Sequence, residues 1–462
     1  MSQPALLEEP RLRKVERRRP TRQGRTYHIR TFGCQMNEHD SEHLAGLFDS
    51  DGMEAAPTYE QADVIFINTC TIRENADDKL YGHLGHLKAL KDDNPDLAIM
   101  VGGCAAQKDR ELVQERAPWV DVVLGTHNLD RALALLDYAQ EWGPVAEFAE
   151  ELEALPSDLP VRREVAHSAW VSIQIGCNNT CTFCIVPSVR GREMSRRPGD
   201  VVREVEWLVE DGVVEVTLLG QNVNTYGRDL ALDGRRRPAF AELLRRVGSV
   251  EGVHRLRFTS PHPADFREDV AAAMAETEAV CEQLHLPLQS GSDRILARMH
   301  RGYNAARYLK KLELARQYLP GLAVSTDLIV GFPGETEEDF QQTLDLVSEA
   351  RYDSAFMFIF SPRPGTQAAT LTDEFVPPEV IADRFARLTE LQNRISLDKN
   401  EAQVGARLEV LVEGPSKKDP TRVTARTRGN HPVHIPGEHQ PGVFVKAQIT
   451  EAFTHYLVGS AI

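Results

Sequence analysis

The first third of the chain repeats one pattern, a short apolar run followed by a stretch with helical spacing of apolar residues. Short apolar runs of this length predict buried strands, and their alternation with helices predicts a doubly wound parallel sheet. The predicted strands are Tyr27–Phe32, Ala62–Asn68 and Leu97–Val101, and the predicted helices are Ser41–Phe48, Arg73–Leu90 and Ala106–Arg116.

The same alternation continues through the middle of the chain, with six further strand candidates that are each followed by a helical pattern. Six strand–helix units are too few for a closed eight-stranded barrel, so they predict an open, incomplete (βα)6 barrel. The six candidates are 169–175, 214–219, 254–259, 283–287, 323–330 and 354–360.

Near the carboxyl terminus the spacing of the apolar residues changes. A long helical stretch from Pro378 to Lys399 is followed by short alternating strands, which predict a small all-β barrel. The predicted strands are Arg407–Val412, Arg422–Arg428, His431–Ile435 and Gly442–Ile449. The fold class is therefore α/β with a terminal β-barrel.

These patterns divide the 462 residues into segments. We predict a disordered basic arm at 1–24, a doubly wound domain at 25–140, an acidic linker at 141–165, a barrel domain at 166–398 and a β-barrel at 399–462. No apolar segment reaches the length of a membrane span and no signal-peptide core is present, so the sequence favours a cytoplasmic protein. Seven cysteines in so long a chain do not form a disulfide framework.

Three of those cysteines stand in one polar loop, directly after the first predicted barrel strand. Cys177, Cys181 and Cys184 have the spacing Cys-x3-Cys-x2-Cys. Thiolates this compact suit zinc or an iron–sulfur cluster, and simple core packing is the third interpretation. Zinc would require a fourth ligand, and the nearest other His or Cys is His167, across the strand. Three thiolates around a four-iron cluster would leave one iron open for chemistry.

A second set of thiols is dispersed along the chain. Cys34, Cys70 and Cys104 each follow the end of a predicted strand of the first sheet, at spacings of 36 and 34 residues. Because parallel strands end at one edge of a sheet, we expect these three thiols to converge there. Each could instead be a packed core residue. Cys281 has no partner at ligand spacing, so packing is its expected role.

Polar and glycine-rich clusters follow the other predicted barrel strands. In parallel barrels the chemistry lies at the carboxyl ends of the strands. These clusters therefore mark the expected cosubstrate site, although the glycines could simply permit turns. They are Gly220-Gln-Asn222, Ser260-Pro-His262, Gln289-Ser-Gly291 and Gly331-Phe-Pro-Gly334.

Charge is unevenly distributed. The net charge is −16, whereas residues 1–30 carry +6 and residues 401–462 carry +1, which leaves about −23 on the middle of the chain. An acidic body with basic ends favours nucleic-acid binding through the ends. Arg422, Arg426 and Arg428 alternate along one predicted strand, so they can share a face and bind phosphates, although a solvated charged face is the alternative.

The cysteine loop, with Phe183 before its last cysteine, resembles the radical S-adenosylmethionine superfamily. Thr31-Phe-Gly-Cys-Gln-Met-Asn37, Asn68-Thr-Cys70 and Gly102-Gly-Cys104 resemble the amino-terminal domain of the methylthiotransferases within it. Val423-Thr-Ala-Arg-Thr-Arg-Gly429 and Leu457-Val-Gly459 resemble the TRAM domain, an RNA-binding module.

This resemblance implies two 4Fe-4S clusters, one held by Cys177, Cys181 and Cys184 and one by Cys34, Cys70 and Cys104. It further implies that S-adenosylmethionine is the cosubstrate, with contacts from the strand ends. The superfamily commonly has an acidic residue where this chain has Gln221. The implied cosubstrate contacts are Phe183, Gln221, Asn222, Ser260 and Gln289.

The motifs point most closely to the tRNA-modifying branch that methylthiolates carbon 2 of N6-dimethylallyladenosine beside the anticodon. One S-adenosylmethionine would methylate a sulfur on the amino-terminal cluster, and a second would yield the radical that takes hydrogen from the adenine. The implied partners are tRNA and an electron donor such as flavodoxin or ferredoxin, and the enzyme is expected to be a monomer without membrane association.

Several alternatives stand beside this interpretation. Within the family they are branches that act on threonylcarbamoyladenosine or on an aspartate of a ribosomal protein. Outside it they are a ferredoxin-like electron carrier and a non-enzymatic RNA-binding protein with structural zinc. Binding of S-adenosylmethionine would exclude the electron carrier, and labile sulfide would exclude the zinc protein.

Overall fold

The computed structural model describes residues 21–71, 76–149, 160–232 and 234–462. The predicted basic arm therefore lies outside the described residues up to residue 20, and the predicted linker does so at 150–159. Among the residues that are described, no helix is both long and apolar enough to cross a membrane.

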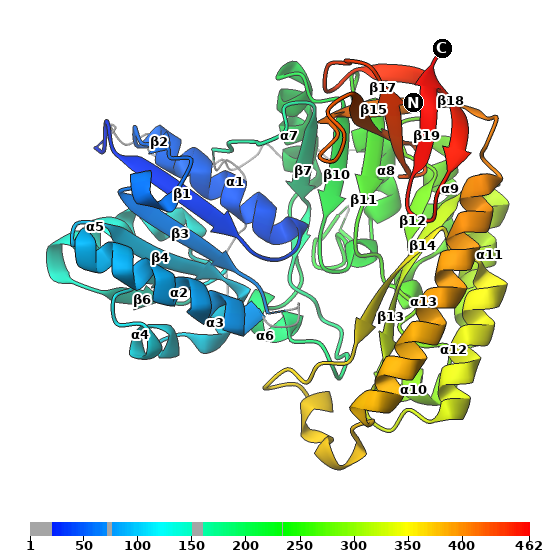
Figure 1. The fold of residues 1–462 in the computed structure, drawn as a ribbon, viewed down its shortest axis with the longest axis horizontal. Helices are drawn as coiled ribbons and strands as arrows, with labels where there is room; N and C mark the ends of the chain where they lie inside the picture. Colours follow the sequence, from blue (N-terminus) through cyan, green and yellow to red (C-terminus); the bar gives the residue numbers. More distant parts are fainter. Residues whose placement is uncertain (1–20, 72–75, 150–159, 233) are drawn as a thin grey trace.

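The amino-terminal part is a six-stranded parallel sheet with the strand order β2-β1-β3-β4-β5-β6 (Figure 1). One apolar core joins α1 and α5 to the sheet, and a separate core joins α2 and α4 to it. The predicted doubly wound sheet is confirmed, and the short strands β2, β5 and β6 extend it. The elements are β1 (Thr26–Thr31), α1 (Gln35–Ser50), β2 (Glu54–Ala55), β3 (Val64–Thr69), α2 (Ala76–Asp93), β4 (Ala98–Gly103), α3 (Cys104–Asp109), α4 (Leu112–Arg116), β5 (Val122–Leu124), α5 (Ala132–Trp142) and β6 (Val145–Glu147).

Two helices of this part begin earlier than the apolar periodicity predicts. Helix α1 starts at Gln35 rather than at residue 41, and α3 starts at Cys104. The helix predicted for residues 106–116 is in fact two helices, because Arg110 has φ of 50° and breaks the hydrogen-bonded ladder. Both early starts place a cysteine at or just before the first turn of a helix.

The middle part contains the six predicted barrel strands in two parallel sheets, β11-β10-β7 and β12-β13-β14. A parallel bridge between Leu256 and Val280 links the two sheets. The end strands β7 and β14 complete no closed ring, so the predicted open barrel is confirmed. Its elements are β7 (Ser168–Ser172), β8 (Gln174–Ile175), α6 (Val186–Arg190), β9 (Met194–Ser195), α7 (Pro198–Glu210), β10 (Glu215–Leu219), α8 (Phe240–Gly248), β11 (Arg255–Phe258), α9 (Glu268–Glu276), β12 (Gln283–His285), α10 (Asp293–Arg298), α11 (Ala305–Tyr318), β13 (Ala323–Val330), α12 (Glu337–Ala350), β14 (Ser354–Ile359) and α13 (Pro378–Glu401).

The carboxyl-terminal part is a closed barrel with the order β15-β16-β17-β19-β18. The predicted small all-β barrel is confirmed, and β19 adds a fifth strand to the four that the alternating pattern predicted. This barrel covers the amino-terminal ends of the α/β barrel strands, with α13 running beside them (Figure 1). Arg255 and Arg257, from β11, donate to backbone carbonyls of the small barrel and fix it there. The strands are β15 (Arg407–Pro415), β16 (Arg422–Thr427), β17 (Pro432–Pro436), β18 (Phe444–Ala452) and β19 (Leu457–Ala461).

Candidate metal centres and substrate site

Cys34, Cys70 and Cys104, which we call the N-terminal cysteines, are brought together at the carboxyl edge of the first sheet. Cys34 immediately precedes α1, Cys70 follows β3, and Cys104 is the first residue of α3. The loop before α1 passes so close to Cys70 that a side chain at Gly33 would lie 2.9 Å from the Cys70 Cβ. Gly33 also has φ of 135°, so both the space and the backbone conformation favour glycine.

Asn37 organises the three loops that carry the N-terminal cysteines. Its side-chain nitrogen donates to the Phe32 and Thr69 carbonyls at 3.0 and 2.6 Å. Its side-chain oxygen lies 3.9 Å from the Cys34 sulfur and 3.8 Å from the Cys104 sulfur. Asn37 is fully buried, so a single amide ties the ends of β1 and β3 to two of the thiols. Sequence reasoning identified it only as part of a motif.

Cys177, Cys181 and Cys184, which we call the loop cysteines, lie after β8 at the carboxyl end of the α/β barrel. The Gly176 nitrogen donates to the side chain of Gln221, and the Cys177 nitrogen donates to the Gly191 carbonyl at 3.1 Å. Arg301 donates to the Cys181 sulfur at 3.3 Å. Sequence reasoning missed this arginine because 120 residues separate it from the thiol.

The thiols at both sites have raised pKa values. Burial, together with the charges of the neighbouring loop cysteines, raises the pKa of Cys177 to about 12 and that of Cys184 to about 11. Burial likewise raises the pKa of Cys104 to about 11, and the charges of Cys34 and Cys70 act in the same direction. Such thiols stay protonated unless a metal stabilises their thiolates.

The donor set at each site consists of three thiols, which is the ligand chemistry of an iron–sulfur cluster. Across the described ranges, no three His, Cys, Asp or Glu side chains are close enough together to hold a single metal ion. In an iron–sulfur cluster each thiolate binds a different iron, so the thiols need not meet at one point. The residues at both sites fit a cluster on these grounds.

The two sites are joined by the short helix α6. This helix begins two residues after Cys184, and its N-cap residue Ile185 and its own Val189 pack against Cys104. The Thr126 hydroxyl, from the first domain, donates to the Val189 carbonyl at 2.7 Å. The chain that leaves the loop cysteines therefore forms a wall of the N-terminal cysteines.

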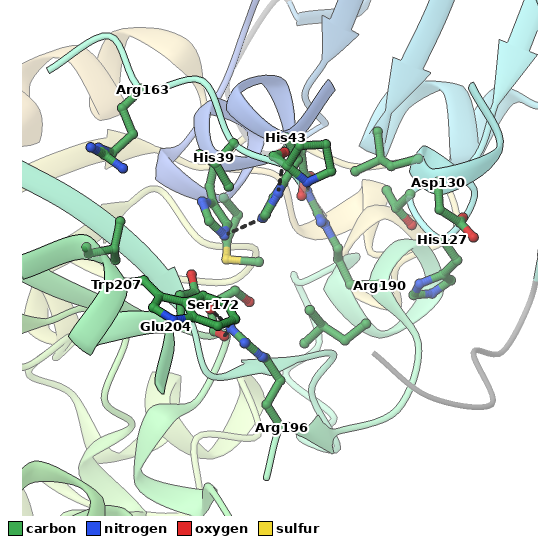
Figure 2. A pocket seen from close by; sticks show the side chains of 18 of the residues that line it. His39, His43, His127, Asp130, Arg163, Ser172, Arg190, Arg196, Glu204 and Trp207 are labelled. Atoms are coloured by element: carbon green, nitrogen blue, oxygen red, sulfur yellow. Dashed lines mark hydrogen bonds and ion pairs between the residues drawn. The ribbon is translucent and has the colours of Figure 1, made fainter. Parts of the chain in front are cut away.

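A cavity of about 510 Å³ lies between the first domain and the α/β barrel, beside this connection. Figure 2 shows histidines and arginines around it, with Trp207 among the barrel residues. Arg190, at the end of α6, belongs both to this lining and to the surroundings of the N-terminal cysteines. The labelled side chains at the cavity include His39, His43, His127, Arg190, Arg196 and Trp207.

The predicted cosubstrate residues lie in the loops after the barrel strands and, for Phe183, in the cysteine loop itself. Asn222 is buried and donates to Asp265 at 3.0 Å, while its side-chain oxygen has no partner. Ser260 and Gln289 have φ of 58° and 73°, a conformation that is unfavourable for residues with side chains and is frequent at functional sites. Phe183 packs beside a small apolar cluster that contains Met299 and Phe332. Gln221, described above, is tied to the loop backbone.

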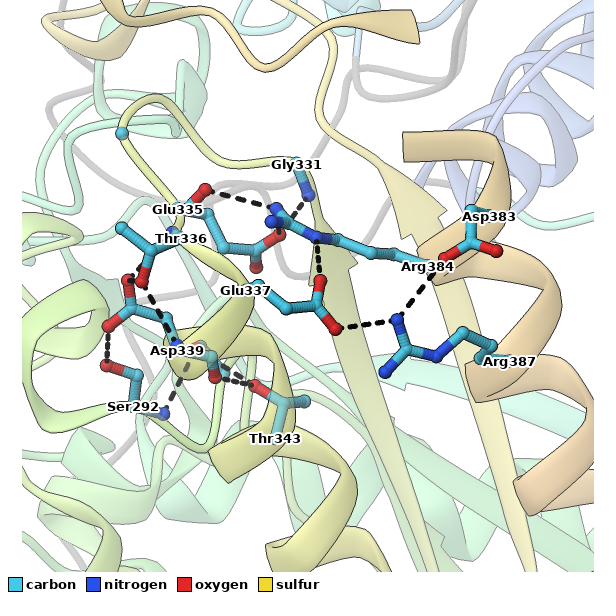
Figure 3. A network of polar contacts seen from close by, with 12 residues as sticks. Ser292, Gly331, Glu335, Thr336, Glu337, Asp339, Thr343, Asp383, Arg384 and Arg387 are labelled. Atoms are coloured by element: carbon cyan, nitrogen blue, oxygen red, sulfur yellow. Dashed lines mark hydrogen bonds and ion pairs between the residues drawn. The ribbon is translucent and has the colours of Figure 1, made fainter. Parts of the chain in front are cut away.

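The fourth predicted cluster, Gly331-Phe-Pro-Gly334, is held by an ionic network from α12 and α13 (Figure 3). The Gly331 nitrogen donates to Glu335 at 3.0 Å, and Arg384 donates to the same carboxylate at 3.0 Å. Gly331 and Gly334 both have φ of 76°. Burial raises the pKa of Glu335 to about 7. This loop is therefore rigidly positioned above the barrel opening.

The interior face of β14 carries exposed aromatic side chains that sequence reasoning missed. Ala355 and Met357 pack toward α13, so Phe356 and Phe358 point to the opposite side, into the open barrel. They are 57% and 49% exposed, although β14 is a strand of the barrel. Phe356 packs edge-on against His285, with ring centroids 5.9 Å apart.

The apolar side chains next to Phe358 extend toward the loop cysteines. Phe358 pairs in register with Ile329 of β13, so the two side chains are neighbours on one face of the sheet. Ile329 packs in the same small apolar cluster as Phe183, which precedes Cys184. An apolar surface thus runs from the middle of the barrel to the cysteine loop. The signal in the sequence would have been the alternation of Phe356 and Phe358 on a predicted barrel strand.

The three predicted RNA-binding arginines lie on or just after β16, on the more exposed side of the strand. Arg422 pairs with Asp419 at 3.2 Å, and Arg426 pairs with Glu413 at 2.6 Å. Arg428 donates to Glu282 and to the Glu278 and Val280 carbonyls. Arg428 thus also helps to hold the small barrel on the α/β barrel.

Comparisons with known proteins agree with this architecture. Residues 171–347 match the model of the radical SAM superfamily, and residues 401–462 match the TRAM domain. Residues 26–125 match the uncharacterized protein family UPF0004. A radical S-adenosylmethionine methyltransferase, TsrM from Kitasatospora setae, has a similar fold, with a TM-score of 0.55 at 12% identity over 80% of this chain and 89% of that chain.

Two relatives are similar over nearly the whole chain. The tRNA-2-methylthio-N(6)-dimethylallyladenosine synthase of Mycolicibacterium vanbaalenii is 55% identical over 454 residues, which cover 96% of this chain and 89% of the relative. The protein of the same name from Parafrankia sp. is 54% identical over 446 residues, or 94% of this chain and 89% of the relative. The chain therefore belongs to the radical S-adenosylmethionine methylthiotransferases, in the family of the tRNA-2-methylthio-N(6)-dimethylallyladenosine synthases.

Proposed function

We propose that this enzyme transfers a methylthio group to carbon 2 of N6-dimethylallyladenosine next to the anticodon of tRNA. The observation that carries the proposal is the junction of the two cysteine sites through α6, in a chain similar to such synthases over nearly its whole length. A reaction that combines a sulfur source with a radical requires two such sites close together.

The N-terminal cysteines and the loop cysteines would each hold one 4Fe-4S cluster. Such clusters, when bound, carry the sulfur for transfer and pass on the electron that cleaves S-adenosylmethionine. A small donor such as flavodoxin or ferredoxin would provide that electron in the cytoplasm. The chain's own contribution is to bury the thiols, to orient them through Asn37 and Gly176, and to keep the two sites adjacent.

S-adenosylmethionine would bind at the strand ends beside the loop cysteines. The unpartnered oxygen of Asn222 and the side chain of Gln221 offer acceptors for the amino group. Ser260 and Gln289, which are held with positive φ in the loops after β11 and β12, would offer further contacts. Phe183 would border the cosubstrate from the cysteine loop. Two molecules of S-adenosylmethionine would be used in each turnover.

The substrate base would lie against Phe356 and Phe358 inside the barrel. Aromatic side chains stack on bases, and an apolar five-carbon tail gains about 0.8 kcal/mol for each methylene or methyl group that leaves water. The whole tail would contribute roughly 4 kcal/mol, or nearly a thousandfold. The surface from Phe358 to Phe183 would direct the base toward the loop cysteines.

The first test separates the two cysteine sites. In the reconstituted wild-type enzyme we expect about eight irons per chain, four at each site. Cys177→Ala should abolish formation of 5′-deoxyadenosine and retain about half of the iron. Cys70→Ala should still cleave S-adenosylmethionine but transfer no methylthio group. Loss of all iron in both variants, or four irons in the wild type, would contradict two independent sites.

The second test concerns the substrate. Four substrates are offered in parallel: unmodified tRNA, tRNA with N6-dimethylallyladenosine, threonylcarbamoylated tRNA, and the ribosomal protein. Nucleoside and peptide mass spectrometry should detect methylthiolation of the prenylated tRNA, roughly a thousandfold faster than of unmodified tRNA. Preference for either of the last two substrates would refute the assignment to the prenylated base. Phe358→Ala should reduce the preference for the prenyl group, whereas Tyr138→Ala, an exposed aromatic residue of α5 in the first domain, serves as the control.

The third test concerns RNA binding by the terminal barrel. Replacing Arg422, Arg426 and Arg428 together should weaken tRNA binding and reduce its dependence on salt, because each lost phosphate contact lowers the slope by roughly 0.7 to 0.9. Since Arg428 also holds the barrel in place, the double variant of Arg422 and Arg426 is measured beside the triple one. Unchanged affinity in both variants would assign these arginines to intramolecular pairing.

A further inference from the structure

Arg190 belongs to the α/β barrel domain, but its guanidinium lies within the first domain. It donates to the Asn37 side-chain oxygen at 2.9 Å and to the Asp40 carboxylate at 2.7 Å. The same Asn37 oxygen is within 4 Å of the Cys34 and Cys104 sulfurs. Arg190 is only 4% exposed, so this positive charge is placed beside the N-terminal cysteines with little screening by water.

Arg301 holds the corresponding position at the other site. It donates to the Cys181 sulfur at 3.3 Å and to the Tyr303 hydroxyl at 3.0 Å, and it is 6% exposed. Each set of cysteines therefore has one buried arginine next to it. The two sites differ in the origin of that charge, because Arg301 comes from its own domain and Arg190 comes from the other domain.

We infer that Arg190 is a positioning residue that sets the reduction potential of the cluster held by the N-terminal cysteines, and that it does so only while the two domains are docked. The inference rests on the proposed function, since it requires iron at those cysteines. A cluster that gains one electron becomes more negative. A buried guanidinium beside it favours the reduced form, and therefore raises the potential.

The surrounding charges determine how large this effect is. Asp40 is the direct partner of Arg190 and opposes its field. His127 lies near enough to interact with both groups, and it faces the same cavity. The field of Arg190 still acts on Cys104 and Cys34, because the guanidinium is close enough to interact with both thiols. Removal of Arg190 and removal of Asp40 should therefore shift the potential in opposite directions.

The test measures reduction potentials in full-length, reconstituted enzyme by electron paramagnetic resonance. The Cys177→Ala background contains iron only at the N-terminal cysteines, and the Cys70→Ala background contains iron only at the loop cysteines. In the first background, Arg190→Gln should lower the reduction potential by at least about 59 mV, which for one electron is a tenfold change in the ratio of reduced to oxidised cluster. Asp40→Asn should raise it, and Arg190→Lys should stay near the wild type.

Arg301→Gln is the matched control, because it removes the same charge from the other site. It should shift the potential in the Cys70→Ala background and leave the Cys177→Ala background unchanged. If Arg190→Gln keeps its iron and its potential, the inference is wrong. If Arg190→Gln loses iron, restoration of iron and potential by Arg190→Lys supports the inference, and failure of Arg190→Lys refutes it. Absence of iron at the N-terminal cysteines of the parent protein would instead refute the proposed function.

Discussion

Replacement of Arg257 by methionine should weaken the attachment of the terminal barrel to the amino-terminal ends of the α/β barrel strands. Arg257 is 7% exposed, and it donates to the Arg428 and Thr427 carbonyls at 2.8 and 2.9 Å and to Glu215 at 2.9 Å. A hydrogen bond from a charged donor contributes about 1.5 to 3 kcal/mol, and two of these cross the interface. Methionine keeps the apolar stem but leaves two carbonyls and one carboxylate without this partner.

From these contacts we expect a loss of about 4 kcal/mol in the free energy that holds the two barrels together. At roughly 2 to 4 °C for each kcal/mol, the melting temperature should fall by about 8 to 16 °C in scanning calorimetry. The melting temperature of Arg257→Lys should lie between those of the wild type and of Arg257→Met, because an ammonium cannot donate to both carbonyls in the geometry of the guanidinium fork. The exposed Arg236→Met is the control and should change little. Equal melting temperatures for Arg257→Met and Arg236→Met would refute this account of the interface.

Three further outcomes are expected. Burial raises the pKa of Glu335 from 4.5 to about 7, so the protonated side chain stabilises the folded protein fully below about pH 4.5. This stabilisation, up to about 3 kcal/mol, is lost as the pH rises through 7. Glu335→Gln should therefore make the melting temperature less dependent on pH between about pH 5 and 8. Gly291→Ala should destabilise the enzyme by about 1 to 3 kcal/mol in urea unfolding, because its Cβ would lie 2.4 Å from the Gln342 carbonyl oxygen; a stable variant would show that the loop can move. Cys281→Ala should retain the full iron content by chemical analysis, since Cys281 is buried near Arg257 and Arg428 at the interface with the terminal barrel, and loss of iron would make it a ligand.

The local pattern of apolar residues was sufficient to predict the strands in which side chains alternate regularly between two environments. The apolar runs at 323–330 and 354–360 coincide with β13 and β14 to within one residue, because both are strands whose side chains alternate between the core and the barrel interior. The pattern failed at residues 106–116, where the positive φ of Arg110 divides the helix. A break caused by one backbone conformation leaves no trace in apolar periodicity.

The sequence by itself determined the order of strands and helices, and through it the convergence of Cys34, Cys70 and Cys104, because parallel strands must end at one edge. Only the tertiary structure placed Arg190 beside those thiols, 153 residues from Asn37, and seated the terminal barrel on Arg257. Periodicity depends on which side of an element faces the core, and this is a local property. The pairing of Arg190 with Asn37 depends on how two separately folded domains dock, and no repeat in the chain encodes that orientation.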